Sequence, residues 1–205
     1  MHISLSLVTS LLPLLSLAEN APASTSAYMD AATGIQFQKF SASGMSIGLA
    51  LPDGGNSPDL IAQMTGDPNT KWAGASLGPA MVGSVLIMAW PNEGTVQTSL
   101  RQATTFASPP VYAGATLTPI AKGTFVTETG WQATMLCKGC LANATLAFAQ
   151  GDMSANMGYV SATAAPITPA DVASPVAKHD VFGKYVSAVG AARSAMFATW
   201  AGMAA

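Results

Sequence analysis

The chain has few side chains that could bind a metal or carry electrons. It contains eleven methionines and two histidines, and one of the histidines, His2, lies in the apolar N-terminal stretch. If that stretch is removed, His179 is the one imidazole left. A methionine and a histidine together are the axial ligands of many electron-transfer haems, whereas a bis-histidine haem or a multi-histidine zinc or copper site needs more imidazoles. Taken alone the pair is a weak signal, because methionines mostly fill protein cores.

The two cysteines, Cys137 and Cys140, are separated by two residues. A zinc site would need a second pair of ligands, and covalent haem attachment would need a histidine directly after Cys140, where the chain has Leu141. A thioredoxin-like motif would need a βαβ context. Combined with an export signal, the spacing favours a short structural disulfide that closes a turn. Shortly afterwards, Asn143 begins an Asn-Ala-Thr sequon for N-glycosylation, expected on a surface turn.

Charged residues are scarce. The 205 residues include 8 Lys and Arg and 10 Asp and Glu, which gives a net charge of -2. Binding to nucleic acid or to an anionic membrane surface is therefore excluded, since both need clustered basic side chains. Most acidic residues stand in turn sequences, so paired catalytic carboxylates are poorly supported. With 50% hydrophobic residues, 19 Gly and 13 Pro, the composition is typical of a secreted all-β domain.

The N-terminus supports secretion. Residues 3–17 are mostly apolar, and a small-x-small cleavage sequence ends at Ala18. A stretch of about 15 apolar residues is too short to span a bilayer, so we interpret residues 1–18 as a signal peptide and residues 19–205 as one mature domain. A buried strand is the alternative interpretation. Residues 20–27 are expected to be a disordered terminus, and no later window is apolar and long enough for a membrane span.

The rest of the chain has the pattern of short strands separated by Gly, Pro, Asn or Asp. The predicted strands are 35–38, 45–51, 60–65, 72–77, 85–90, 95–101, 115–119, 125–129, 131–136 and 145–149. About ten strands at roughly 8–12-residue spacing predict an antiparallel β-sandwich, with the first two forming a hairpin. Trp72 and Trp90 are expected to pack in its core. For residues 185–203, a short terminal helix and a strand followed by one turn both fit the pattern.

A set of short motifs recurs in order along residues 28–200, and together they resemble a known family. They are Thr33-Gly34-Ile35-Gln36-Phe37, Lys71-Trp72-Ala73-Gly74, Leu77-Gly78-Pro79-Ala80-Met81, a strand ending Ala89-Trp90, Cys137-Lys138-Gly139-Cys140, His179-Asp180-Val181-Phe182-Gly183 and Ala192-Arg193-Ser194-Ala195. This arrangement is similar to the haem-binding cytochrome domain of fungal cellobiose dehydrogenases and related secreted, DOMON-like b-type cytochromes. The resemblance implies an immunoglobulin-like antiparallel β-sandwich of two sheets that holds haem b without covalent bonds.

The resemblance also assigns roles to single residues. The family's axial methionine falls on Met81 and its axial histidine on His179. Where we expect a family tyrosine near a haem propionate, this chain has Phe106, so that hydrogen bond is either missing or supplied by Tyr112. Arg101 is expected either beside a propionate or as a solvated cation at a strand edge.

The implied function is extracellular electron transfer by a b-type cytochrome that has no substrate site of its own. Its donor would be a flavin or quinone dehydrogenase, and its acceptor a copper polysaccharide monooxygenase or ferric iron. The sequence contains no flavin domain, so the chain alone is not expected to oxidise a sugar, and whether it stands alone or belongs to a larger protein is open. The alternative from another class is a haem-free carbohydrate-binding module, which a visible spectrum would distinguish.

Overall fold

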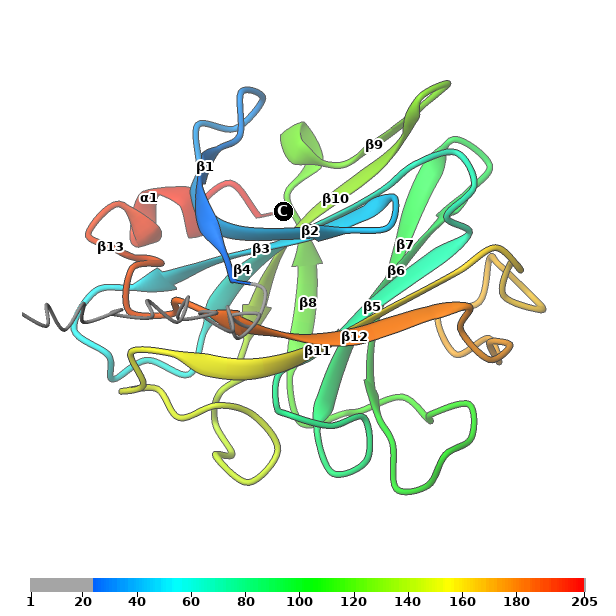
Figure 1. The fold of residues 1–205 in the computed structure, drawn as a ribbon. Helices are drawn as coiled ribbons and strands as arrows, with labels where there is room; N and C mark the ends of the chain where they lie inside the picture. Colours follow the sequence, from blue (N-terminus) through cyan, green and yellow to red (C-terminus); the bar gives the residue numbers. More distant parts are fainter. Residues whose placement is uncertain (1–23, 205) are drawn as a thin grey trace, which may run out of the picture.

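The computed structural model describes residues 24–204 as two β-sheets that face each other, drawn in Figure 1. The expected signal peptide at 1–18 lies outside the described residues. One sheet contains eight strands: in spatial order β1 (Ser26–Met29), β2 (Gln36–Ala42), β3 (Met45–Pro52), β4 (Leu60–Gly66), β10 (Gly130–Lys138) and β8 (Thr116–Pro119), with β9 (Phe125–Thr127) also on β10 and β13 (Arg193–Ser194) parallel to β3. The predicted all-β, two-sheet architecture is confirmed.

The second sheet carries the functional site. Its five antiparallel strands lie in the order β12 (Val181–Ser187), β11 (Ala155–Ala162), β5 (Trp72–Ser76), β6 (Val85–Asn92) and β7 (Thr95–Gln102). β5, β6 and β7 follow one another in the chain, whereas β11 and β12 come from its last third. The strand order therefore brings the 78–84 loop close to segments that lie far away in the sequence.

Most predicted strands are present, but one is wrong. Residues 145–149 form turns instead of a strand, with the Leu146 amide donating to the Asn143 carbonyl and the Phe148 amide to the Leu77 carbonyl. The segment is apolar because Ala147 and Phe148 are buried in the interior core, which does not require an extended backbone. The expected disorder at 20–27 is also wrong for its described part, because β1 begins at Ser26 and pairs with β2.

The predicted β2–β3 hairpin is confirmed. Its strands pair antiparallel from Gln38 opposite Leu49 to Ala42 opposite Met45. The turn between them contains Ser43 and Gly44 with φ angles of 46° and 76°, and two consecutive positive φ angles suit the right-handed twist of a hairpin.

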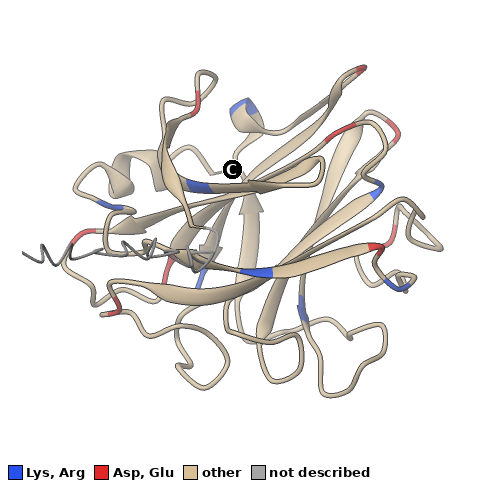
Figure 2. Cartoon of the chain, in the orientation of Figure 1, with Lys and Arg blue, Asp and Glu red and all other residues tan. Residues whose placement is uncertain are grey.

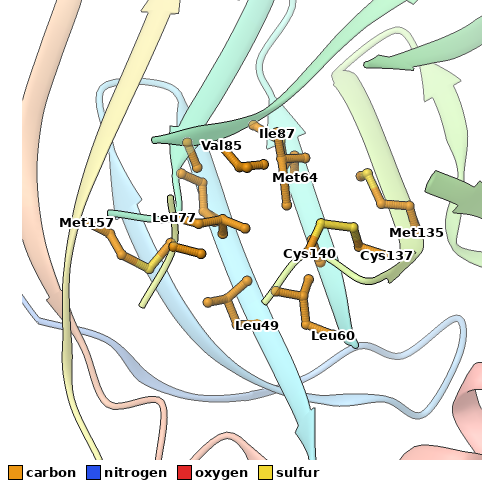
Figure 3. Packing of buried hydrophobic residues seen from close by; sticks show 14 of the residues in the cluster. Leu49, Leu60, Met64, Leu77, Val85, Ile87, Met135, Cys137, Cys140 and Met157 are labelled. Atoms are coloured by element: carbon orange, nitrogen blue, oxygen red, sulfur yellow. A yellow bond between two sulfur atoms is a disulfide. The ribbon is translucent and has the colours of Figure 1, made fainter. Parts of the chain in front are cut away.

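The interior core lies between the sheets. Leu49, Leu60 and Met64 from one sheet pack there with Val85 and Ile87 from the other (Figure 3). The predicted disulfide is confirmed, since Cys137 and Cys140 are bonded with their Cα atoms 5.8 Å apart and both side chains are buried in this core. The disulfide therefore fixes the bend that follows β10 and adds apolar surface to the core.

The outer faces of the two sheets are covered differently. Over the eight-stranded sheet lies α1 (Phe197–Ala201), whose Phe197 and Trp200 pack on a second apolar cluster with Ile35, Phe37 and Ile61. The terminal helix is thus one of the two expected outcomes. Among the described residues no helix is long and apolar enough to cross a membrane. Over the five-stranded sheet lie loops instead of a helix, and these enclose a cavity.

Candidate functional site

A cavity of about 760 Å³ lies on the outer face of the five-stranded sheet. Small-molecule and cofactor sites typically have volumes of roughly 300–1,000 Å³. Its floor consists of residues that alternate with those in the interior core: Trp72, Gly74 and Ser76 on β5, Leu86 and Met88 on β6, and Gly158 and Val160 on β11. Its walls are three loops, which contribute Pro79 to Met81, Phe106 to Pro109 and Val176 to His179, and β12, which contributes Phe182, Gly183 and Lys184.

Small residues keep the floor of the cavity low. Gly74 lies opposite Val160 on β11 and Met88 on β6. A Cβ atom on Gly74 would come within 3.1 Å of the Val160 side chain, and one on Gly158 would come within 2.7 Å of the Ser76 hydroxyl. The glycines therefore leave room for a flat apolar group to lie against the sheet.

The structure brings Met81 and His179 to the same cavity, as the sequence led us to expect. Met81 belongs to the loop between β5 and β6, and His179 to the loop before β12. The imidazole is half-buried, with its ring centre 5.1 Å from that of Phe182. Among residues 24–204, its Nδ1 atom is buried and has no hydrogen-bond partner. A buried polar atom without a partner is costly, which makes Nδ1 a locally strained position in this loop.

The protonation of His179 suits a metal ligand. Burial lowers the pKa of this imidazole below its ordinary value, and the charge of Lys178 lowers it further, although the residue's own backbone and Asp180 act in the opposite direction. The neutral form therefore predominates at neutral pH, and only a neutral imidazole has a lone pair to offer.

Two exposed aromatic side chains border the cavity. Phe106 is 90% exposed and Phe182 is 70% exposed. Both also line the cavity, so a bound molecule would cover part of each ring. Phe106 thus lies at the site, as expected, but it offers a ring and no hydroxyl. Neighbouring exposed apolar groups of this size are a sign of a binding surface.

Arg101 does not line the cavity, and the expectation of a solvated cation is wrong. It lies on the edge strand β7, but loops cover it and leave it 1% exposed. Its guanidinium donates hydrogen bonds to the carbonyl oxygens of Pro109 at 2.7 Å, of Val172 at 2.6 Å and of Ser174 at 2.9 Å. Its Nε donates to the Ser99 hydroxyl. Arg101 therefore ties two of the cavity's loops to the sheet.

Tyr112 also lies outside the cavity lining. Its ring packs against the interior core and over Gly114, where a Cβ atom would meet the phenol oxygen. Its backbone amide donates to the Leu100 carbonyl. The structure thus places the Tyr112 hydroxyl away from the cavity. Phe106, in contrast, lines the cavity.

The expected position of two tryptophans is corrected. Trp72 and Trp90 pack together with Met88 on the outer face of the sheet and not in the interior core, and Trp72 lines the cavity. The sequence contains a signal for this position. Along β5, Ala73 and Ala75 place their small side chains in the interior core, so Trp72, which precedes Ala73, lies on the opposite face of the strand. Sequence reasoning also missed the cavity-lining roles of Met88, Gly74, Gly158, Lys178 and Lys184.

The predicted sequon stands on an exposed turn. The side-chain Oδ1 of Asn143 accepts hydrogen bonds from the Thr145 amide and hydroxyl, at 3.0 and 2.7 Å. The surface-turn expectation is met, and glycosylation of Asn143 stays a prediction.

Comparison with known families gives a decisive match. The family model for the cytochrome domain of cellobiose dehydrogenase matches residues 28–199. The chain belongs to that family. The cytochrome domain of Myriococcum thermophilum cellobiose dehydrogenase is 28% identical, with a TM-score of 0.80 over 88% of this chain and 96% of that one.

Two further similarities come from Coprinopsis cinerea. The cytochrome b domain of its pyranose dehydrogenase shares the fold of this cytochrome domain, with a TM-score of 0.81, 24% identity and coverage of 88% of this chain and 95% of that one. Its pyrroloquinoline quinone-dependent pyranose dehydrogenase is 30% identical over 186 residues, which is 87% of this chain. Those residues make up 25% of that relative, so the chain spans about a quarter of its length.

The cavity of this cytochrome domain fits a haem. Haem is a flat, largely apolar macrocycle around iron, and a thioether with an imidazole is one of its usual ligand pairs. The low floor at Gly74 and Gly158 suits the macrocycle. The imidazole of His179 and the thioether of Met81, on separate loops of one cavity, supply the donor types.

Proposed function

We propose that this domain holds haem b between Met81 and His179 and transfers single electrons. The observation that carries the proposal is that these two side chains, far apart in the sequence, line one cavity with a floor of small and apolar residues. When bound, the haem supplies an iron that accepts and releases one electron.

The haem would be held without covalent bonds. Thioether attachment needs free thiols, and Cys137 and Cys140 are bonded to each other in the interior core. That core lies on the opposite face of the five-stranded sheet from the cavity. Binding would therefore depend on the axial ligands, on apolar contact with the sheet and on polar groups at the edge of the cavity.

Each cavity residue has a distinct task in this proposal. His179 provides a neutral imidazole, and Met81 provides a thioether, which raises the reduction potential relative to a second imidazole. Because both residues would hold the iron, the domain would have no substrate site of its own. Phe106 and Phe182 would limit the contact of water with the bound group, because both rings border the cavity. Arg101 keeps two loops in place through their carbonyl oxygens.

The electron donor would be a flavin or quinone dehydrogenase. Support comes from the family, which is described as the cytochrome domain of a dehydrogenase, and from the relative that is a pyrroloquinoline quinone-dependent dehydrogenase. The acceptor would be a copper polysaccharide monooxygenase or ferric iron. Secretion is supported by the apolar stretch at residues 3–17 and by the disulfide, since disulfides persist in oxidising compartments.

A haem titration tests this function. The purified domain is mixed with increasing amounts of haem b, and visible spectra are recorded in the oxidised and dithionite-reduced states. We expect saturation at one haem per chain, the narrow reduced bands of a six-coordinate low-spin iron, and complete extraction of the haem by acidified acetone. A protein that stays colourless would overturn the proposal and favour a haem-free binding module.

A further inference from the structure

Within the described range, residues 24–204, the cavity is lined by two cations and by no carboxylate. Lys178 and Lys184 are among its lining residues, whereas no Asp or Glu is. This local excess of positive charge contrasts with the net charge of -2 of the chain, which has 8 Lys and Arg in total. Apart from these lysines and His179, the lining is apolar or small, with Tyr159 and two serines as the other polar residues.

The two lysines come from β12 and from the loop before it. Lys184 is on β12 directly opposite Gly158, which belongs to the floor. Lys178 lies in the loop before β12, next to His179. Figure 2 shows basic residues both on β12 and in the loop that precedes it. Both lysines are exposed, so their alkyl stems can follow the cavity wall while the ammonium groups stay at its water-facing edge.

Neighbouring charges have other partners. Asp180 lies between the two lysines in the sequence, but its carboxylate accepts hydrogen bonds from the Thr163 amide and hydroxyl, both at 2.7 Å, and it does not line the cavity. Arg101 is held by backbone carbonyl oxygens. The positive charge that borders the cavity is therefore that of the lysines.

We propose that Lys178 and Lys184 form an anion-binding edge that pairs with the two propionate carboxylates of the bound haem. This assignment rests on the proposed function. It gives the two lysines the propionate contacts that were expected of Arg101 and Tyr112. It also orients the macrocycle, since its carboxylates would face the β12 edge and its apolar side would lie against Trp72 and Val160 on the floor. Ion pairs at a water-exposed edge are weak individually, so each lysine should contribute modestly.

The test measures haem release. Wild-type protein and the variants Lys178→Gln, Lys184→Gln and the double variant are loaded with haem b or with its dimethyl ester, in which the carboxylates carry no charge. Transfer of each macrocycle to excess apomyoglobin is followed by absorbance. Lys122→Gln is the matched control, because Lys122 is exposed on the 3-10 turn Ala121–Gly123 and does not line the cavity.

We expect haem b to leave about two- to fivefold faster from each single variant and roughly tenfold faster from the double variant. About 1 M salt should bring the wild-type rate close to that of the double variant. The dimethyl ester should leave all proteins at the same rate. Equal release of haem b from the double variant and from Lys122→Gln would overturn the proposal while leaving the haem function intact. A wild-type protein that binds neither macrocycle would overturn both.

Discussion

The guanidinium of Arg101 donates a 2.9 Å hydrogen bond to the carbonyl oxygen of Ser174, a buried residue in the same loop as His179. A second donor of this guanidinium reaches Pro109 in the loop that carries Phe106. A planar cation with several fixed donors is suited to such a junction, because it can satisfy several converging carbonyl oxygens at once. The edge strand β7 thus determines the position of a loop that lies far along the chain.

Arg101→Lys should lower the free energy of unfolding by about 2–4 kcal/mol. The ammonium group of lysine cannot donate in all the fixed directions of the guanidinium, so buried carbonyl oxygens would be left unpaired. Haem release should also accelerate. Urea unfolding and transfer to apomyoglobin measure the two effects. Arg193→Lys is the control, since Arg193 also donates to two carbonyl oxygens, of Gln150 and Asp152, but lies on β13 beside the other sheet. Unchanged haem release in Arg101→Lys would contradict the positioning role.

Replacing the proposed axial ligands should change the spectrum in different ways. His179→Ala should leave no low-spin haem, because no other described residue is a histidine. Met81→His should keep a six-coordinate haem and lower its reduction potential, since a thioether favours ferrous iron relative to imidazole. Potentiometric titration with optical detection measures this. Met88→Leu is the control, because Met88 lines the same cavity from the floor. If the reduction potential changed in Met88→Leu and stayed the same in Met81→His, Met88 and not Met81 would be the ligand.

Gly74→Val should impair haem binding more than folding. The added side chain would rise from the floor between Val160 and Met88, where the macrocycle is expected to lie. We expect the haem dissociation constant to increase roughly ten- to a hundredfold, as measured by spectral titration. Gly151→Val is a matched control, because a Cβ atom there has no neighbour closer than 4.0 Å and the residue does not line the cavity. Equal affinities in the two variants would show that the floor does not contact the haem.

A buried carboxylate should make stability depend on pH. Burial alone would raise the pKa of Asp30, but hydrogen bonds from Thr33 and Gln132 outweigh it, and the net pKa is lowered. A carboxyl group whose pKa falls on folding stabilises the native state above the unfolded value of 3.8, and this contribution is lost as pH falls through the lower, folded value. Asp30→Asn should therefore cost about 1–3 kcal/mol at pH 7.

The same comparison at about pH 2 should give a smaller difference, because the wild-type carboxyl group loses its charge as the pH falls through its lowered pKa. Urea unfolding of both proteins at the two pH values is the measurement. Asp53→Asn serves as the control, since the Asp53 carboxylate lies in an exposed loop and, among residues 24–204, accepts a hydrogen bond from the adjacent Gly54 amide alone. A loss in Asp30→Asn that is the same at both pH values would mean that packing, and not charge, accounts for it.

Much of the fold could be predicted from the sequence, since local patterns determine it. Alternating or apolar runs bounded by turn formers predicted nine of the strands, and the Cys137–Cys140 spacing predicted the disulfide. Strands β1, β11, β12 and β13 were missed, and of these β1 and β13 are only four and two residues long. β11 includes Gly158 and β12 includes Gly183 and Lys184, and these residues line a cavity instead of filling a core, so the usual alternation is weak there.

For the site, the sequence by itself determined that Met81 and His179 were the pair to examine, because the imidazole inventory is so small and the family motifs coincide with them. Only the tertiary structure decided which groups surround them. Trp72 faces the cavity, Arg101 is buried under loops, and Lys178 and Lys184 line the cavity. These facts depend on which sheet face each strand residue occupies and on how loops distant in sequence cover that face. The physical reason is that side-chain alternation shows that a strand has two faces, but only packing against the other elements decides which face becomes the core and which becomes the site.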